Sequence, residues 1–378
     1  MFMGVLSRLC VLMLLIALVS CSPVEPITPA FSTDTQIQPT TMTVQPTLPL
    51  TPLPPVQILA SPTVINPAAT TSSLTDATKI EDSVPQVLSG HTGMVTFVDF
   101  SPDGSLLAST GEDRTVRLWD VETGETIQVI PAGSGSMRGL DFSIDGRWMA
   151  TVEADNSIAL WDLSTGEAAW RIKPASIQAC GVEFSPDGKK LATGQVNGVV
   201  QVWNVTDGGP VNELNGLKAL SCSLAFSPDG NLIAAGGGDP DYRVLVWEVS
   251  SGKLIHTLVG HTKNVYQVVF SPEGNLIASA SGDRMVKVWD SNSGDLVYNL
   301  TADRYKMSSV DFSPDGSWLV TGGIDKVVKL WDVKTGKLLF SLPGHLGEIY
   351  AVSYSPTGEI FASCGERGEV LLWRIHSP

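Results

Sequence analysis

The chain is poor in basic residues and in histidine. Its 378 residues include 24 Lys or Arg against 39 Asp or Glu, which gives a formal net charge of −15, and only five residues are His. Proteins that bind nucleic acids usually display a basic face, so this balance argues against a nucleic-acid partner. It also argues against flat adsorption on anionic lipid. A metal centre built on three histidines is not supported either, because His256 and His376 stand alone in the sequence.

Short catalytic motifs are missing as well. The sequence has no GxSxG elbow, no HExxH zinc motif, no phosphate-binding GxxxxGK[ST] loop and no CxxC pair. We therefore predict no catalytic residue, no metal site and no cofactor, and we interpret the chain as noncatalytic.

The apolar run at the start of the chain is too short to cross a bilayer. Residues 9–19 follow Arg8 and are almost wholly apolar, whereas a spanning helix needs roughly 20 residues. The run ends Leu18-Val19-Ser20-Cys21, which resembles the signal of bacterial lipoproteins. The resemblance implies that residues 1–20 are a signal peptide, that Cys21 carries the lipid, and that the protein is anchored in the bacterial cell envelope on the extracytoplasmic side. An ordinary signal peptide followed by a chance cysteine is the alternative.

Residues 21–82 lack a hydrophobic period and carry few charges. They are dense in Pro, Thr and Ser, so they cannot bury a core and are predicted to form a disordered tether. A flexible coil of about 60 residues has an end-to-end distance of roughly 45 Å. We therefore expect contact with the membrane through the lipid anchor only.

Tryptophan, by contrast, recurs with a regular period. The spacing is 42 to 44 residues, at Trp119, Trp161, Trp203, Trp247, Trp289, Trp331 and Trp373. A self-similar unit of this length is typical of a propeller blade. Stretches such as 116–119 alternate with the two-residue period of a strand, and Ser-Pro-Asp-Gly turns such as 101–104 indicate tight hairpins. Residues 83–378 are thus predicted to be an all-β, seven-bladed β-propeller of four-stranded antiparallel blades.

The two ends of this region predict how the ring closes. The chain stops five residues after Trp373, so the seventh unit lacks an outer strand. Residues 84–88 precede Gly90-His91 as residues 338–342 precede Gly344-His345. We therefore predict that this N-terminal strand completes blade seven. An outermost strand has a free edge, so Pro85 is acceptable there.

These motifs make residues 84–378 resemble the WD-repeat propellers. In that family a His, a Ser or Thr, an Asp and the Trp of one blade form a hydrogen-bonded chain. Two blades match this tetrad in full, with His91, Ser109, Asp113 and Trp119 in blade one and His261, Ser279, Asp283 and Trp289 in blade five. The resemblance favours a structural role for these histidines over a metal or catalytic role.

Other blades depart from the tetrad. Gly133, Ala175 and Asp303 stand at the histidine position. The turn carboxylate is kept or approximated at Asp155, Asp241, Asp325 and Asn197. Blade seven has His345, Ser363 and Trp373, but Arg367 replaces the acid. We expect these blades to be held mainly by packing.

The resemblance also implies a binding face. WD-repeat proteins commonly bind partners through the third and fifth residues after the histidine and the residue before the turn acid. These positions are Met94, Thr96, Glu112, Arg138, Asn264, Tyr266, Lys306, Glu348, Tyr350 and Glu366. Blades seven and one are neighbours across the seam, so Glu348, Tyr350, Glu366, Met94 and Glu112 are predicted to form an acidic patch with one aromatic residue. We predict a monomeric ring that binds one or more proteins at this face, with a merely solvated rim as the alternative.

Two other functions compete with a protein-interaction scaffold. A propeller enzyme of the lactonase or quinoprotein kind would need carboxylates or histidines that converge on the channel, and we find none in the sequence. Binding of a glycan or small ligand would use the tryptophans outside the period, which are Trp148, Trp170 and Trp318. A calcium site in the wide loop at residues 236–241 is a third, weaker hypothesis.

Two cysteines lie at matching places in neighbouring blades. Cys180 and Cys222 each stand four residues before the aromatic of an inner strand, at Phe184 and Phe226. An exported protein permits a disulfide, which requires a Cα separation of roughly 4.4 to 6.8 Å. The sequence does not supply that distance, and we favour two separate thiols over a disulfide.

Overall fold

A computed structural model describes residues 84–131, 137–173, 178–219, 222–301 and 306–375. The predicted signal peptide, Cys21 and the whole of the predicted tether lie outside the described residues. Every regular element within the described part is a β-strand, and 28 strands form seven four-stranded antiparallel sheets. The described residues include no helix with the length and apolar character that a membrane span requires.

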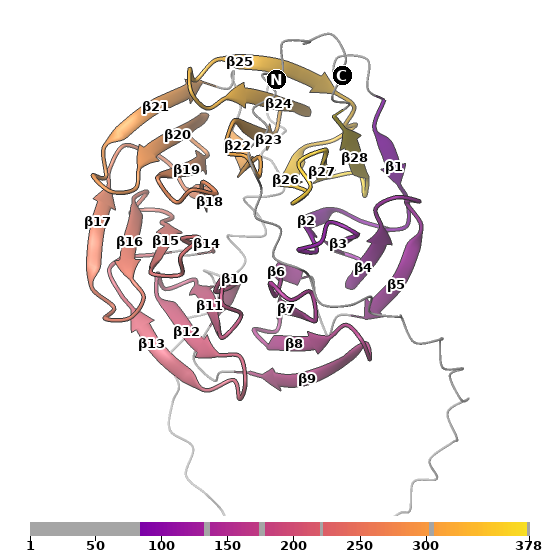
Figure 1. Ribbon diagram of the computed structural model, residues 1–378, viewed down its shortest axis with the longest axis horizontal. Coiled ribbons are helices and arrows are strands. Elements are labelled where there is room, and N and C mark those ends of the chain that lie inside the picture. The colour runs from indigo at the N-terminus through magenta and orange to yellow at the C-terminus, as the bar shows by residue number, and fades with distance from the viewer. Residues whose placement is uncertain (1–83, 132–136, 174–177, 220–221, 302–305, 376–378) are drawn as a thin grey trace, which may run out of the picture. The chain divides into compact units, whose positions relative to one another are not determined.

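The sheets are arranged around an axis as the blades of one ring (Figure 1). Blades one to three consist of β2 (Val95–Phe100), β3 (Leu106–Gly111), β4 (Thr115–Asp120) and β5 (Thr126–Pro131); β6 (Met137–Phe142), β7 (Trp148–Glu153), β8 (Ile158–Asp162) and β9 (Glu167–Ile172); and β10 (Ala179–Phe184), β11 (Lys190–Gln195), β12 (Val200–Asn204) and β13 (Pro210–Leu214). Blades four and five consist of β14 (Ser223–Phe226), β15 (Leu232–Gly236), β16 (Val244–Glu248) and β17 (Leu254–Leu258); and β18 (Val265–Phe270), β19 (Leu276–Ser281), β20 (Met285–Asp290) and β21 (Leu296–Thr301). Blades six and seven consist of β22 (Met307–Phe312), β23 (Trp318–Gly323), β24 (Val327–Asp332) and β25 (Leu338–Pro343); and β26 (Ile349–Tyr354), β27 (Ile360–Gly365), β28 (Val370–Arg374) and β1 (Gln86–Leu88). The predicted fold class is confirmed.

The N-terminal strand closes the ring, as predicted. β1 pairs antiparallel with β28, with Gln86 opposite Leu372 and Leu88 opposite Val370. In Figure 1 this strand lies on the outer edge of blade seven. Leu88 is 1% exposed within the cluster that joins blades seven and one. Burying one leucine contributes roughly 1.5 to 3 kcal/mol, so β1 adds apolar burial as well as a ladder of hydrogen bonds.

The hydrophobic core lies between the blades. Each buried cluster combines strands of two neighbouring blades, as where Trp119 and Leu107 of blade one pack with Ala362 and Leu372 of blade seven. Strand alternation explains this arrangement, because the two faces of each sheet meet the sheets on either side. The periodic tryptophans Trp119, Trp247, Trp289 and Trp373 are among the largest fully buried side chains.

Tight hairpins occupy the end of the ring where the inner strands finish. The Gly104 N–H donates to the Ser101 carbonyl at 2.8 Å, and Ser101 Oγ donates to Asp103 at 2.6 Å. Gly104 has φ +71°, a conformation that glycine adopts without strain. The same serine-to-aspartate bond recurs at Ser143, Ser185, Ser227 and Ser313. We call this end the bottom face and the opposite end, where the inner strands begin, the top face.

Candidate protein-interaction face

The structure brings together both tetrads that the sequence predicts. In blade one, His91 Nδ1 lies 2.9 Å from Asp113 Oδ2, His91 Nε2 lies 2.8 Å from Ser109 Oγ, and Trp119 Nε1 donates to Ser109 Oγ at 2.7 Å. The corresponding distances in blade five are 2.9, 2.8 and 2.9 Å. Each chain of bonds runs from a turn on the top face to a buried indole, so it fixes the loop against the blade.

The charge state of blade one follows from this burial. Burial lowers the pKa of His91, although Asp113 raises it, so the ring is neutral near pH 7. The Nδ1–H group then donates a hydrogen bond to Asp113, and Nε2 accepts one from the Ser109 hydroxyl. Burial opposes the ionised form of Asp113, but hydrogen bonds from Thr115, Thr92 and His91 lower its pKa. These groups are therefore occupied with one another and are not poised for acid–base chemistry.

Blade seven has a complete network, which corrects the expectation drawn from Arg367. His345 Nδ1 lies 3.0 Å from Glu369 Oε1, His345 Nε2 lies 2.6 Å from Ser363 Oγ, and Trp373 Nε1 donates to Ser363 Oγ at 2.7 Å. Glu369 stands two residues after the position of the usual aspartate, and its longer side chain extends to His345. A search for any acid within two residues of the turn position would have found it.

Among the residues that the structure describes, the remaining blades show only fragments of the network. The indoles of Trp161, Trp203 and Trp331 each donate to a threonine hydroxyl, at 2.9, 2.8 and 3.0 Å, in blades two, three and six. Blade four has no hydroxyl at the equivalent position, because Ala235 stands there. Trp247 donates instead to the Asn215 carbonyl at 3.0 Å. We expected packing to hold these blades. The structure adds one hydrogen bond from the indole of each blade's tryptophan.

Five of the ten predicted face residues meet at the seam between blades seven and one. We call Met94, Glu112, Glu348, Tyr350 and Glu366 the seam patch. The Tyr350 hydroxyl donates to Met94 Sδ at 3.2 Å, so side chains from the two blades touch. Burial raises the pKa of Tyr350, and the charges of Glu348, Glu366 and Glu112 raise it further, so all three carboxylates act on one half-buried side chain.

The three glutamates of the seam patch have no ion-pair partner in the described part of the ring. Among the described residues, none forms an ion pair with Glu112, Glu348 or Glu366. Glycines in neighbouring loops leave room for Glu366 and Glu112. A Cβ at Gly347 would lie 2.7 Å from Glu366 Cβ, and one at Gly93 would lie 3.2 Å from Glu112 Cβ.

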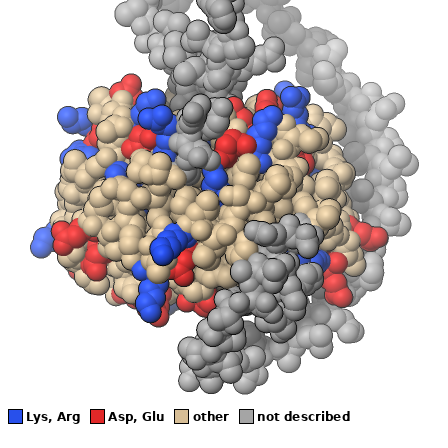
Figure 2. All heavy atoms as spheres, turned by 90° about the horizontal axis from the view of Figure 1, so that it is seen from above, with Lys and Arg blue, Asp and Glu red and all other residues tan. Residues whose placement is uncertain are grey.

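Four other predicted residues lie elsewhere on the top face. Asn264 Oδ1 accepts the Asp239 N–H at 3.0 Å, which ties blade five to the wide loop of blade four. Lys306 Nζ lies 5.5 Å from the ring centroid of Tyr266, across blades six and five. Thr96 bonds to the neighbouring strand of its own blade. Acidic and basic side chains are interspersed along both rims of the ring, and much of the wall between them is uncharged (Figure 2).

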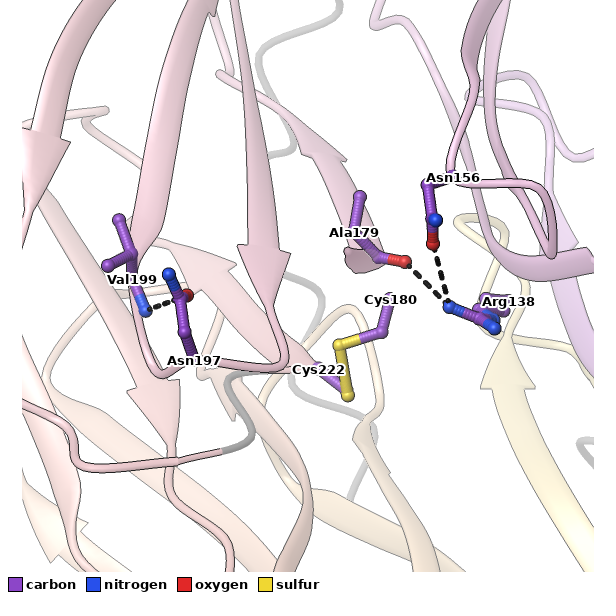
Figure 3. Close-up of a disulfide and its surroundings, with 7 residues drawn as sticks. All are labelled: Arg138, Asn156, Ala179, Cys180, Asn197, Val199 and Cys222. Atoms are coloured by element: carbon purple, nitrogen blue, oxygen red, sulfur yellow. Dashed lines mark hydrogen bonds between the residues drawn. A yellow bond between two sulfur atoms is a disulfide. The ribbon is translucent and has the colours of Figure 1, made fainter. Parts of the chain in front are cut away.

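The tenth residue, Arg138, lies beside a disulfide, which corrects the preference for two thiols. Cys180 and Cys222 are bonded, with a Cα separation of 4.7 Å. The Arg138 guanidinium donates to the Ala179 carbonyl at 3.4 Å and to Asn156 Oδ1 at 3.2 Å (Figure 3). The matching positions of the two cysteines in adjacent blades were the only sequence signal for the bond.

Four carboxylates converge at the inner strands, contrary to the interpretation that none would. Asp99, Asp141, Glu183 and Asp311 each stand immediately before the aromatic that ends an inner strand, and they interact electrostatically. Three of them accept an N–H of the next inner strand, from Phe184 at 2.5 Å, Phe226 at 3.0 Å and Tyr354 at 2.8 Å. They therefore link blades. The repeated acid-aromatic pair was the signal that sequence reasoning overlooked.

Burial governs the protonation of these carboxylates. It raises the pKa of Glu183 to about 8, where the charges of Asp99 and Asp311 add to the shift and the Phe226 N–H opposes it. It raises the pKa of Asp311 to about 7 against two backbone N–H donors. Within the described residues, no group of three or more His, Cys, Asp or Glu side chains is placed to hold a metal ion.

The residues named for a glycan or calcium site make contacts within the ring. Trp148, Trp170 and Trp318 are partly buried and pack against clusters between blades, and Trp170 Nε1 donates to the Val205 carbonyl at 2.9 Å. In the wide loop, Asp241 pairs with Arg243 and accepts the Lys218 N–H at 2.8 Å.

Comparison with known proteins identifies the family. The model of the WD domain, G-beta repeat, matches seven times, at residues 83–120, 124–162, 175–204, 209–248, 252–290, 294–332 and 336–374. The chain therefore belongs to the WD-repeat family. Each match after the first begins near the outer strand of one blade and ends with the third strand of the next, and this offset explains why β1 must complete blade seven.

Individual relatives match over single repeats. They include protein Mut11 of Chlamydomonas reinhardtii, 65% identical over 40 residues, and the small ribosomal subunit protein RACK1 of Medicago sativa, 48% identical over 46 residues. Eukaryotic translation initiation factor 3 subunit I of Neosartorya fischeri is 54% identical over 41 residues. The aligned parts cover 11 to 12% of this chain and 11 to 14% of those proteins.

Proposed function

We propose that this protein is a noncatalytic scaffold that binds one or more proteins through the top face of its propeller. The observation that carries the proposal is the seam patch. Three glutamates surround a half-buried tyrosine there without an ion pair to any described residue. Tyrosine and methionine are enriched at protein interfaces, and the carboxylates favour a basic partner surface.

Further support comes from variation among the blades. The bottom face repeats one hairpin in most blades, whereas each blade presents different side chains at the top. Selective binding needs such variation. The names of two relatives describe a ribosomal subunit protein and a subunit of an initiation factor, which are parts of larger assemblies.

We also propose that the scaffold is tethered to a bacterial membrane through Cys21 and faces the extracytoplasmic side. The Cys180–Cys222 disulfide supports this location, because disulfides persist in oxidising compartments. Labelling cells with a fatty-acid probe tests the anchor. The label should disappear in the Cys21→Ser variant, and its persistence would contradict the assignment.

Site-specific crosslinking tests the binding face. A photo-crosslinking amino acid would replace Leu346, which is 75% exposed on a top-face loop and leaves the seam patch intact, in the full chain within cells. The matched control replaces Ile144, which is 60% exposed in a bottom hairpin. We expect discrete protein adducts from position 346 only.

A second variant ties the adducts to the patch. Changing Glu112, Glu348 and Glu366 together to Gln preserves side-chain size and removes the charge. The adducts should weaken in this variant and with rising salt, because exposed charges are screened. Equal adducts from both faces, or adducts that ignore the triple variant, would count against the seam patch.

A further inference from the structure

The same pair of top-face positions carries opposite charges in blades one and five. In blade one, Glu112 stands before the turn acid and packs against Gly93, where a Cβ would lie 3.2 Å from Glu112 Cβ. In blade five, Lys263 stands in the place of Gly93, and Gly282 stands in the place of Glu112. A Cβ at Gly282 would lie 3.4 Å from Lys263 Cβ, so the lysine packs against that glycine. The charge at this part of the face is therefore reversed between the two blades.

A second position is reversed between blades six and seven. Lys306 directly precedes β22, as Glu348 directly precedes β26. The Lys306 ammonium lies 5.5 Å from the ring centroid of Tyr266 on β18, within the range of a cation–π contact. The top turns of blades five and six each add one exposed cation, Arg284 and Lys326. We call the following residues the basic patch: Lys263, Tyr266, Arg284, Lys306 and Lys326.

The acids in the same two turns are bonded within their blades. The side chain of Asp283 in blade five is 6% exposed, and its carboxylate lies 2.9 Å from His261 Nδ1. In blade six the side chain of Asp325 is 12% exposed and pairs with Lys329. Little of either carboxylate reaches solvent, whereas the cation that follows each one in the chain is exposed. On the side of blade four, the patch is bordered by Asp239, an exposed acid whose N–H bonds to blade five.

The basic patch presents positive charge beside the seam patch. Among the described residues, none forms an ion pair with Lys263, Arg284 or Lys326. Lys326 Nζ donates to the Leu346 carbonyl of blade seven at 2.9 Å. Blades five, six and seven are consecutive in the ring (Figure 1). The top face therefore has a basic region over blades five and six next to an acidic one over blades seven and one.

We propose that the basic patch is a second binding surface on the top face and that it receives an acidic segment of a protein partner. Complementary charge steers such a segment to the patch and fixes its register. Tyr266 adds aromatic surface, and tyrosine is enriched at protein interfaces. The site lies outside the seam patch and has the opposite charge, so it can be removed while the seam patch still binds.

A nucleic acid or another long polyanion fits this surface less well than an acidic protein segment does. The patch has Asp239 on one side and the glutamates of the seam patch on the other, and the whole chain has a formal net charge of −15. A polymer with a negative charge on every unit would meet those carboxylates, and like charges that face each other cost free energy. A protein segment can confine its acidic residues to the part that contacts the cations.

Binding of a labelled hexaglutamate peptide to the full chain tests the patch. Fluorescence anisotropy would be measured for the parent protein and for the Lys263→Gln, Arg284→Gln, Lys326→Gln variant, which loses three exposed cations. We expect the dissociation constant to rise about tenfold, because each exposed charge pair contributes a small amount and three are removed. Binding to the parent protein should also weaken with rising salt. If the parent protein does not bind hexaglutamate, the proposal is overturned.

A matched control removes as much charge from the bottom face. Lys253, Lys334 and Lys337 are exposed in turns between the third and fourth strands of their blades. Changing all three to Gln should alter the dissociation constant by less than about twofold. Equal losses in the two triple variants would mean that the peptide responds only to total charge, and the proposal would fail. Tighter binding of an oligothymidylate of equal charge would also contradict it, because the patch would then be a polyanion site.

The seam patch variant separates this proposal from the proposed function. Changing Glu112, Glu348 and Glu366 to Gln should weaken the adducts from position 346, but it should leave hexaglutamate binding as tight as in the parent protein or tighter. Weaker hexaglutamate binding in that variant would show that the basic patch is not a separate site. Loss of the adducts alone would concern only the seam patch.

Discussion

Blades four and five have the same four strands, yet their polar interiors differ. In blade five a histidine, a serine and an aspartate connect the top loop to the indole of Trp289. In blade four the first two positions are apolar, and Trp247 bonds to a backbone carbonyl. Both tryptophans are buried to 2% exposure or less, so the indole is buried without the histidine and the serine.

What the network supplies is attachment of the top loop. Blade four lacks the histidine but keeps that attachment, because Asp241 accepts the Lys218 N–H at 2.8 Å as Asp283 accepts the Thr262 N–H at 3.0 Å, and the Cys180–Cys222 disulfide adds a link to blade three. Blade seven keeps the network but draws its acid from Glu369. The repeat therefore conserves its strands and its core, while several kinds of bond hold its loops.

The largest effect is expected from breaking the disulfide. A loop of 42 residues separates the two cysteines, for which the chain-entropy description gives about 4 kcal/mol of stabilisation. The Cys180→Ser, Cys222→Ser variant should lose roughly this much free energy of unfolding, measured by urea denaturation. A loss below that of a single network serine would mean that blades three and four do not depend on the bond.

The next effect compares a full network with a fragment. Ser363→Ala removes the acceptor of the Trp373 indole and the donor to His345 Nε2, so we expect a loss of about 3 kcal/mol. Thr193→Val in blade three keeps the buried side-chain volume, removes the hydroxyl that accepts the Trp203 indole, and should cost about 1 kcal/mol. Both hydroxyls are fully buried, which makes the pair a matched test. Equal losses in urea denaturation would show that the histidine adds nothing.

The pH dependence should separate the inner carboxylates from the networks. The pKa of Glu183 is raised from 4.5 to about 8, so its contribution is fully present below pH 4.5 and is lost as pH rises through 8. Burial raises the pKa of Asp283, but His261 and the N–H groups of Thr262 and Met285 together lower it to about 2, so its contribution is lost only as pH falls below 4. Stability should therefore decline between pH 4.5 and about 8.

The Glu183→Gln variant tests the source of this slope. Glutamine still accepts the Phe226 N–H but does not titrate beside Asp99, Asp141 and Asp311. Thermal unfolding should decline less steeply over this range than in the parent protein. A parallel decline would assign the slope to other groups.

Sequence reasoning reached the fold because the fold depends on repeated local features. The tryptophan period, the hairpin turns and the strand at residues 84–88 each recur or complete a recurring unit. The seam patch could also be predicted in outline, because Tyr350 and Met94 occupy equivalent places in blades that meet when the ring closes. Its geometry depends on glycines such as Gly347, whose close contact with Glu366 is visible only in three dimensions.

Contacts between repeats were harder to predict. The Cys180–Cys222 bond depends on how closely two blades approach at Gly181, a distance that no single repeat encodes. Within its own repeat, Asp141 resembles an exposed acid on a strand. Its carboxylate, however, accepts the N–H of Phe184 in the next blade. The network in blade seven was missed for another reason, since the motif was read at fixed spacing and Glu369 lies two residues beyond it.

That displaced acid leads to the smallest predicted effect. Arg367→Asp restores the usual acid at the turn of blade seven. Because Glu369 already bonds to His345, we expect the free energy of unfolding to change by no more than about 0.5 kcal/mol. Glu369→Ala, the matched control, leaves the His345 Nδ1 proton without its acceptor and should cost about 2 kcal/mol. In the combined variant the new aspartate should recover much of that loss, because it stands where Asp113 bonds to His91. A clear gain from Arg367→Asp alone would instead mean that the glutamate is a poor substitute for the aspartate.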